Sequence, residues 1–490
     1  MAAVGLGDDA AQRADAGSLW RWALAGVAGL TLLRWVVLAL SPLELYGDEA
    51  QYWTWAQDLD FGYFTKPPLI AWIIAGTTAL FGDDAFGVRV GAPLCHAVAA
   101  LFIGLAGREL AGPRVGALAM LAYATLPGVS YSSLILSTDA PLLACWAVAL
   151  WAFLRLLATR RLGWALATGL AIAVGLNAKY AMGFFLLCAG LHALFTPDAR
   201  WLLRRPHGAV LLLVGLAGLA PNLAWNLAND WATVGHTAEN ANWGGPLLRP
   251  DRGLEFFAAQ FGVFGPVLFA VLLALAWGWA RGRVSPQIRL ALVFALPILA
   301  LITAQAFLSR AHANWAATAY VAGSLAVMLA LSAPRFRAWL AASFALHGVT
   351  LAGLYLAVVL ADVAPWPEGR DPFARLRGWA AAASALEEAA GGADGRLVIA
   401  DDRMVLASLI HAARDTGLRF AAWDADGAPG NHYELTIPYD TATTPPALLV
   451  SVYPETVDAL PAAWPVGERQ DLSLPVGAGM TRTLYLWRVN

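Results

Sequence analysis

Apolar runs of about 20 residues recur along most of this 490-residue chain and decide what it can fold into. An α-helix rises about 1.5 Å per residue, so a run of that length crosses the hydrocarbon core of a bilayer. Charged residues make up only 13% of the chain, against about 25% in soluble domains, which agrees with a membrane location. The sequence therefore predicts a mainly α-helical bundle that crosses the membrane many times.

We predict about eleven spans, with approximate ranges 19–40, 86–107, 114–130, 138–156, 162–176, 178–196, 208–226, 256–280, 290–308, 315–333 and 338–361. Arginines gather in alternate loops between these runs, and the positive-inside rule places such loops in the cytoplasm. The other loops carry acidic residues and are predicted to face outward. Because the number of spans is odd, the N-terminus is predicted to be cytoplasmic and the C-terminus to lie on the outer side.

The apolar character ends near Asp362, where we predict a domain boundary between a transmembrane module (1–362) and a small outer α/β domain (363–490). The elements expected in this domain are a helix at 371–390, a strand at 396–400, a helix at 403–415, and strands near 418–423, 446–452 and 481–488. A further helix is expected between the last two strands.

The first outward-facing loop, about residues 41–85, carries an acidic pair directly after the first span, Asp48 and Glu49. Carboxylates are costly beside hydrocarbon, so this pair indicates chemistry more than packing. A positioned carboxylate can take the proton of an attacking hydroxyl, and Asp48 is predicted to be such a base. Neighbouring side chains on a helix diverge by about 100°, so Glu49 is expected to orient or bind instead. The alternative is an ordinary solvated acid pair.

Lysine is rare in this chain: only Lys66 and Lys179 occur among 32 basic residues. Both are predicted on the same outer side as Asp48, and a compact ammonium suits phosphate oxygens. We therefore predict both lysines to bind the phosphate of a lipid-linked donor, with Arg89 and Arg310 as further ligands. GC-rich coding could produce the same imbalance, and Arg89 could instead extend toward the interface.

Asp139 begins the predicted span 138–156, where it could cap the helix, orient an acceptor or hold a catalytic cation. An outer loop at about 227–255 is rich in Asn and Trp and could contact a sugar. Further substrate-binding candidates on the outer side are Tyr52, Tyr63, His236, His312 and Asn314. The two histidines could equally be structural. No His, Cys and Asp set has metal-ligand spacing, so no metal site is predicted, and a divalent cofactor is possible but unsupported.

Three segments resemble a known family: Tyr46-Gly47-Asp48-Glu49-Ala50-Gln51-Tyr52-Trp53, Gly62-Tyr63-Phe64-Thr65-Lys66-Pro67-Pro68 and Phe86-Gly87-Val88-Arg89. They are similar to the GT-C membrane glycosyltransferases. More narrowly, they resemble the bacterial branch of the protein O-mannosyltransferase family that includes the lipid A aminoarabinose transferases (glycosyltransferase family 39-like). The likeness covers about residues 20–330.

The resemblance implies an inverting transferase that moves a sugar from a polyprenyl-phosphate donor to a hydroxyl or phosphate of a lipid, glycan or protein. It implies an active site at the periplasmic face of a bacterial inner membrane. Asp48 matches the family's first-loop catalytic acid and Asp139 its second acidic position, while Lys66 and Lys179 match lysines implicated with the lipid phosphate. Thr65 stands where the aminoarabinose enzymes have an acid, so neither the sugar nor the acceptor is carried over from them.

Two alternatives lie outside catalysis: a transporter or flippase for lipid-linked sugars, and a non-catalytic binder of them. A transporter would need polar groups deep within its spans, whereas the charges here concentrate at the outer boundaries, which favours an enzyme. The net charge of −2 gives no reason to expect a nucleic-acid partner.

Overall fold

The computed structural model describes residues 3–241, 248–391, 397–424, 427–439, 446–460 and 464–489. The chain forms two compact units. The first, called here the helical unit, comprises Met1–Ala39, Lys66–Ile70 and Arg89–Leu356; the second, called the loop-and-sheet unit, comprises Leu40–Thr65, Ala71–Val88 and Ala357–Asn490. The predicted domain boundary at residue 362 stays a prediction.

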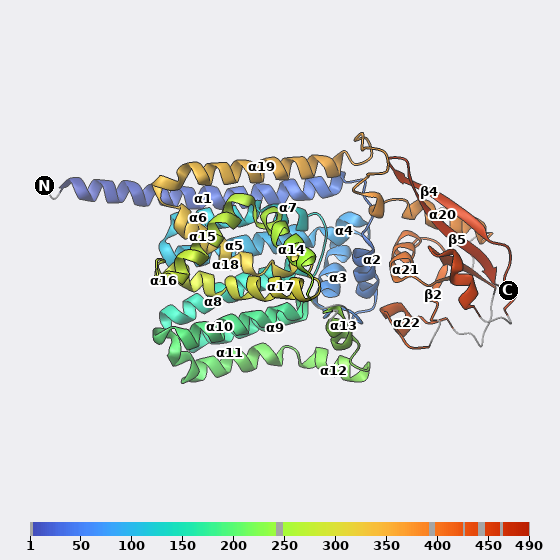
Figure 1. The fold of residues 1–490 in the computed structure, drawn as a ribbon, viewed down its shortest axis with the longest axis horizontal. Helices are drawn as coiled ribbons and strands as arrows, with labels where there is room; N and C mark the ends of the chain where they lie inside the picture. Colours follow the sequence, from blue (N-terminus) through green and yellow to red (C-terminus); the bar gives the residue numbers. More distant parts are fainter. Residues whose placement is uncertain are drawn as a thin grey trace. The chain divides into compact units, whose positions relative to one another are not determined.

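The helical unit is a bundle of helices, labelled in Figure 1. They are α1 (Ala3–Leu40), α5 (Gly91–Ala111), α6 (Pro113–Thr125), α7 (Pro127–Ser132), α8 (Asp139–Thr159), α9 (Leu162–Ala178), α10 (Gly183–Phe195), α11 (Pro206–Ala217), α12 (Ala220–Ala228), α13 (Ala232–Asn240), α14 (Pro250–Phe264), α15 (Pro266–Ala280), α16 (Pro286–Val293), α17 (Leu296–Leu308), α18 (Ala319–Leu331) and α19 (Arg337–Val359). Short 3-10 turns at Tyr180–Met182, Pro197–Leu203, Ala313–Ala316 and Pro334–Phe336 connect several of them.

Six helical segments in the described residues are long and apolar enough to cross a membrane. They are Gly17–Leu40, Ala85–Ala111, Asp139–Thr159, Pro206–Ala228, Pro286–Leu308 and Pro334–Val359. Shorter apolar helices occupy most of the other predicted spans. The predicted fold class, a membrane helical bundle with a small C-terminal sheet, is confirmed, while the number eleven stays a prediction.

The predicted span 256–280 is not one straight helix. Helices α14 and α15 meet at 116°, because the junction holds Gly265, with a φ of +85°, followed by Pro266. Proline cannot donate the hydrogen bond that would continue the helix, and a positive φ breaks the helical path. The chain therefore turns sharply here, and α14 leaves the axis of α15.

Aromatic side chains and close glycine contacts hold the bundle together. Phe153 of α8, Phe185 of α10 and Phe294 after α16 are buried, and their ring centroids lie 5.1–6.1 Å apart, in the range for favourable ring packing. Helices α5 and α6 approach closely, since a Cβ on Gly107 would lie 2.9 Å from the Cα of Gly116. Small residues at such crossings are typical of helix packing in membranes.

Arg34 is a charged residue buried within the candidate span Gly17–Leu40. Arg34 of α1 is 1% exposed, and its Nε donates to the hydroxyl of Tyr355 on α19 at 2.8 Å. Its Nη2 donates to the carbonyl oxygen of Ala124, at the end of α6, at 2.5 Å. Figure 1 shows α1 and α19 running side by side. A guanidinium in hydrocarbon is costly unless hydrogen-bonded, so these contacts fasten the first span to the last.

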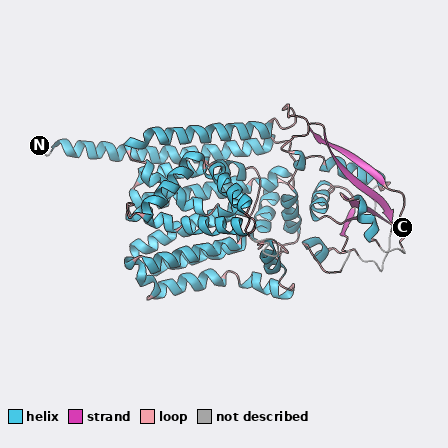
Figure 2. Ribbon diagram, in the orientation of Figure 1, coloured by secondary structure: helices cyan, strands magenta, loops and turns pink. Residues whose placement is uncertain are grey.

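The loop-and-sheet unit holds α2 (Gly47–Gln57), most of α3 (Leu69–Phe81), α4 (Ala85–Arg89), α20 (Trp379–Ala389), α21 (Arg403–Ala412) and α22 (His432–Thr436). Its strands are β1 (Leu397–Ala400), β2 (Arg419–Ala422), β3 (Ala447–Ser451), β4 (Gln470–Gly477) and β5 (Met480–Val489), magenta in Figure 2. Their order is β2-β1-β3-β5-β4, with β1 parallel to β2 and β3, and β5 antiparallel to β3 and β4. Val398 pairs with Leu448 and Leu449 with Trp487, all buried.

Two expectations for this sheet region are wrong. The helix expected at 371–390 begins only at Trp379, because Gly378 has a φ of +83° and cannot continue a helix. No helix beyond a 3-10 turn (Pro454–Ala459) lies in the described residues between β3 and β5; β4 is there instead and forms a hairpin with β5. Positive φ angles at Gly477, Ala478 and Gly479 make that turn.

The first loop packs within the same unit as the sheet. The Glu44 carboxylate accepts hydrogen bonds from the backbone N–H groups of Trp379 (2.8 Å) and Ala380 (2.7 Å) at the start of α20. The first N–H groups of a helix have no partner within it, and a carboxylate there also complements the helix dipole. An acid in the first loop therefore caps a helix more than 330 residues later in the chain.

Candidate active site

The structure separates the two acids of the predicted catalytic pair. Glu49 is 2% exposed, and its Oε2 accepts from the backbone N–H of Tyr46 at 3.0 Å, which caps the start of α2. The Asp48 side chain is 40% exposed. One acid is thus turned back onto its own helix, and the other is accessible to a ligand.

Arg403 of α21 contacts the accessible acid. Its Nη1 donates to Oδ1 of Asp48 at 3.3 Å and to Oε1 of Gln51 at 2.8 Å. Sequence analysis missed this residue. Arg403 lies 355 positions beyond Asp48 and belongs to no motif in its own region, so no local signal pointed to it.

Three predicted site residues meet in the helical unit. Asp139 opens α8, Lys179 follows α9 with an extended backbone, and Asn314 lies in the 3-10 turn Ala313–Ala316. The Lys179 ammonium donates to Oδ1 of Asp139 at 2.7 Å, and the Asn314 amide donates to Oδ2 at 2.5 Å. The Asp139 side chain is 8% exposed and that of Lys179 is 23% exposed.

The hydrogen-bond partners of Asp139 indicate whether its carboxylate caps α8. Both carboxylate oxygens accept from side chains of other elements, and within the described residues neither accepts from the backbone of α8. The carboxylate therefore fixes an ammonium and an amide at one point, at the ends of three separate chain segments. Such a cluster can hold a charged substrate group and orient it.

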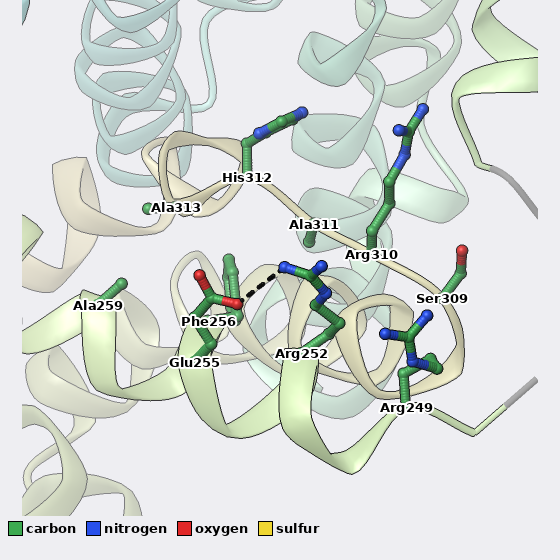
Figure 3. Close-up of a pocket in the computed structure, with 10 residues that line it drawn as sticks. All are labelled: Arg249, Arg252, Glu255, Phe256, Ala259, Ser309, Arg310, Ala311, His312 and Ala313. Atoms are coloured by element: carbon green, nitrogen blue, oxygen red, sulfur yellow. Dashed lines mark hydrogen bonds and ion pairs between the residues drawn. The ribbon is translucent and has the colours of Figure 1, made fainter.

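A cavity of about 470 Å³ adjoins the segment that carries Asn314. Its lining residues are Arg249, Arg252, Glu255, Phe256, Ala259, Ser309, Arg310, Ala311, His312 and Ala313. Figure 3 shows the segment Ser309–Ala313 crossing the start of α14, with Arg310 and His312 extending away from that helix. Two predicted residues, Arg310 and His312, thus lie at one cavity, together with Arg249 and Arg252, which sequence analysis did not single out.

The cations of this cavity differ in how they are engaged. Arg252 pairs with Glu255 at 3.1 Å and Arg249 with Asp251 at 3.0 Å, all of them well exposed. The Arg310 guanidinium has no hydrogen-bond or ion-pair partner among the described residues. Solvent screens exposed ion pairs strongly, so the paired arginines can exchange partners at low cost. The cavity can therefore accept an anion, with Arg310 as the readiest ligand.

The remaining predicted residues lie in varied settings. Lys66 is half-buried and Arg89 is 2% exposed, which is not what an arginine extending toward the interface would show. His236 is half-buried and hydrogen-bonds Asn240 within α13 at 2.9 Å. Part of the predicted sugar-contacting loop, residues 242–247, lies outside the described residues. In the described parts of the chain, no three His, Cys, Asp or Glu side chains are grouped so as to hold a metal ion.

Tyr52 and Tyr63 are packed inside the loop-and-sheet unit. Tyr63 stacks on Trp55 with ring centroids 4.7 Å apart, and its hydroxyl donates to the carbonyl oxygen of Trp55 at 3.0 Å. Tyr52 lies 5.1 Å from the same ring. Burial raises the pKa of Tyr63 to about 12. The structure gives both tyrosines a packing role, and their predicted contact with substrate stays a prediction.

His432 of α22 lies edge-on to this aromatic cluster and makes folding of the unit sensitive to pH. Its ring lies 5.5 Å from Trp55 and 5.6 Å from Tyr63, and burial lowers its pKa from 6.5 to about 4. The unfolded chain thus binds the proton more readily, so stability is full above pH 6.5 and falls between 6.5 and 4. We expect His432 to contribute a loss of about 2 kcal/mol at pH 5 relative to pH 7.5 in the detergent-solubilised protein. Thermal unfolding across this range measures it, and an equal pH slope in His432→Phe would contradict it.

Comparisons with known proteins match this chain to transferases of sugar groups. Residues 65–225 match the family described as dolichyl-phosphate-mannose-protein mannosyltransferase. The chain is 37% identical over 413 residues to lipid A galacturonosyltransferase RgtD of Rhizobium johnstonii, covering 83% of this chain and 86% of that relative. It is 28% identical over 306 residues to the undecaprenyl phosphate-alpha-4-amino-4-deoxy-L-arabinose arabinosyl transferase of Pseudomonas aeruginosa, covering 55% of this chain and 54% of that relative.

The fold has a counterpart among solved structures. The crystal structure of ArnT from Cupriavidus metallidurans in the apo state has a TM-score of 0.67 and 18% sequence identity, covering 96% of this chain and 98% of that chain. The structure of the same protein bound to undecaprenyl phosphate has a TM-score of 0.65, with 95% and 98% covered. At this identity the likeness shows the fold.

Proposed function

The chain belongs to the bacterial GT-C glycosyltransferase family that includes lipid A galacturonosyltransferase, and we propose that it transfers an acidic sugar, a galacturonosyl residue, from polyprenyl phosphate to lipid A. It is a multi-pass protein of the bacterial inner membrane and a glycosyltransferase that uses a polyprenyl-phosphate-linked sugar. The sugar, the acceptor, the periplasmic orientation and the residue roles are the proposal. The orientation rests on the distribution of arginines among the loops.

The cationic cavity beside Asn314 supports an acidic sugar as the group transferred. A galacturonosyl donor has two anionic groups, the sugar carboxylate and the phosphate, whereas 4-amino-4-deoxyarabinose adds a cation. Among the described residues the Arg310 guanidinium has no partner, and that of Arg252 is held by an exposed pair. Guanidinium groups bind carboxylate and phosphate alike through paired N–H donors. Thr65 replaces the acid that the aminoarabinose enzymes have before Lys66, which removes a negative charge. The greater identity to the galacturonosyltransferase points the same way.

The chemistry proposed for the site is a single displacement at the anomeric carbon. Asp48 accepts the proton of a lipid A hydroxyl as the hydroxyl oxygen bonds to C1 of the sugar. The bond from C1 to the phosphate oxygen breaks, and polyprenyl phosphate leaves with the electron pair, so the configuration inverts. Lys66 and Lys179 stabilise the charge that develops on the phosphate. Asp139 holds Lys179 in place for that task through the 2.7 Å contact.

A transfer assay with two donors tests the proposal. The purified protein in lipid nanodiscs is given lipid A with either polyprenyl-phosphate galacturonate or polyprenyl-phosphate aminoarabinose, and the product is identified by mass spectrometry. We expect galacturonate transfer and little or no aminoarabinose transfer. Aminoarabinose transfer alone, or galacturonate transfer to another envelope glycan alone, would contradict the proposal.

A matched pair of variants ties the result to the cavity. Arg310→Ala removes the unpaired guanidinium and is expected to raise the KM for the galacturonate donor about tenfold, the effect of losing one charge-assisted hydrogen bond. Arg283→Ala removes an equally exposed arginine from another loop and should leave the KM unchanged. If the two substitutions raised the KM equally, the cavity would not be the site that binds the donor.

A further inference from the structure

Helices α2 and α21 pack with their N-termini together in the loop-and-sheet unit. A Cβ on Gly47, the first residue of α2, would lie 2.6 Å from Cε of Met404, so glycine at this position lets the two helices pack closely. Asp402 caps α21 by accepting from the N–H groups of Met404 (2.8 Å) and Val405 (2.9 Å). These contacts bring Arg403, the first residue of α21, onto the face of α2 that carries Asp48.

A second contact strengthens this docking farther along α2. The hydroxyls of Tyr433 in α22 and Thr54 in α2 are hydrogen-bonded at 3.1 Å, and the rings of Trp53 and His411 meet edge to face at 4.9 Å. Both ends of α2 are therefore held by the C-terminal segment of the chain. The helix that carries the proposed base has little freedom to rotate against α21.

Gln51 determines where the Arg403 guanidinium lies. Asp48 and Gln51 are three residues apart on α2 and share one face. Gln51 is 1% exposed, and its Oε1 accepts from Arg403 at 2.8 Å, shorter than the 3.3 Å contact to Asp48. An arginine has only donors, so it fixes the amide with its oxygen toward the guanidinium. The buried glutamine thus anchors the arginine, and the arginine reaches the carboxylate from a set direction.

We propose that Arg403 is a positioning residue for Asp48, which makes the C-terminal segment part of the catalytic machinery. This inference rests on the proposed function, in which Asp48 is the base. Arg403 takes one carboxylate oxygen, Oδ1, and so restricts the rotation of a side chain that is 40% exposed. The other oxygen is directed to the acceptor hydroxyl. Orientation of this kind acts on the chemical step and leaves donor binding unchanged.

Substitution of Arg403 in the full-length protein tests the proposal. Arg403→Met keeps the length of the side chain without its donors, and we expect kcat to fall roughly 10- to 100-fold while the donor KM stays within about twofold. Arg403→Lys keeps a charged donor group and should recover most of the lost kcat, and added ethylguanidinium should partly restore Arg403→Met. Arg414→Met, at the other end of α21, is the matched control and should keep wild-type kcat.

The outcomes distinguish two claims, the positioning role of Arg403 and the role of Asp48 as the base. A wild-type kcat for Arg403→Met would overturn the positioning role, as would a kcat loss that Arg403→Lys does not relieve or that accompanies a lower melting temperature. An Asp48→Asn variant separates this failure from that of the proposed function. If Asp48→Asn is inactive and Arg403→Met is fully active, only the positioning role fails. If Asp48→Asn keeps wild-type transfer, the base assignment fails as well.

Discussion

Replacing Asp48 by asparagine is expected to reduce sugar transfer by roughly three orders of magnitude, since a positioned general base contributes about 10²–10⁴-fold. Asparagine has nearly the same shape and keeps an oxygen that can accept from Arg403, so the local packing should survive. It cannot take a proton at neutral pH. We therefore expect the substitution to lower the rate constant of transfer, which is measured under single-turnover conditions with labelled donor. Binding of polyprenyl phosphate should be unchanged.

The control for this experiment lies in the same loop. Asp58 is exposed one residue beyond the end of α2, and Asp58→Asn removes the same charge from the same loop. It should keep wild-type transfer. Retained transfer in Asp48→Asn would contradict a base at position 48. An equal loss in Asp58→Asn would show that the charge of the loop matters and not a base at that position.

Removing the Asp139 carboxylate should cost both stability and activity. In Asp139→Ala the Lys179 ammonium and the Asn314 amide lose their partner at a largely buried position. Breaking a buried ion pair costs about 3–5 kcal/mol; because Lys179 is 23% exposed, we expect about 2–3 kcal/mol here. Transfer should fall below about 1% of wild type, because Lys179, the proposed ligand of the leaving phosphate, is no longer held.

A double variant separates the two effects. Asp139→Ala with Lys179→Met leaves no unpaired charge and should regain most of the lost stability while staying inactive. The exposed pair of Arg155 and Glu109, at 3.0 Å, serves as the control, and Glu109→Gln should change stability by less than about 1 kcal/mol. Thermal unfolding and transfer rates measure both outcomes. Recovered activity in the double variant would contradict a catalytic role for this pair.

Much of the helical unit could be predicted from the sequence, because membrane spans are set by length and hydrophobicity alone. The contact of Asp139, Lys179 and Asn314 could be anticipated in part, since each residue lies at a predicted outer boundary of a span and such boundaries share one plane. The bend between α14 and α15 could also be predicted from the sequence, because Gly265-Pro266 interrupts the apolar run. The prediction nevertheless treated residues 256–280 as a single span, because the alternation of basic and acidic loops is the same with or without the bend.

The rest depends on tertiary contacts that local sequence does not encode. Whether Glu49 caps its own helix or faces a ligand depends on side-chain rotation, and Arg403 reaches Asp48 from 355 residues away. The strand β4 was missed because it pairs only with β5 and holds a proline, which weakens its strand signal. Arg249 and Arg252 were passed over because a run of charges at a loop end usually indicates only a solvated surface.

The buried Arg34 links membrane insertion to completion of the chain. Helix α1 leaves the ribosome first, and the hydroxyl that accepts from its guanidinium belongs to Tyr355, synthesised 321 residues later. Until that residue arrives, the charge is incompletely solvated, and lipid disfavours it. The hydrogen bonding of this guanidinium is therefore completed only when α19 lies beside α1. A chain that stalls before α19 leaves the Nε donor of Arg34 without the hydroxyl that accepts from it in the finished protein.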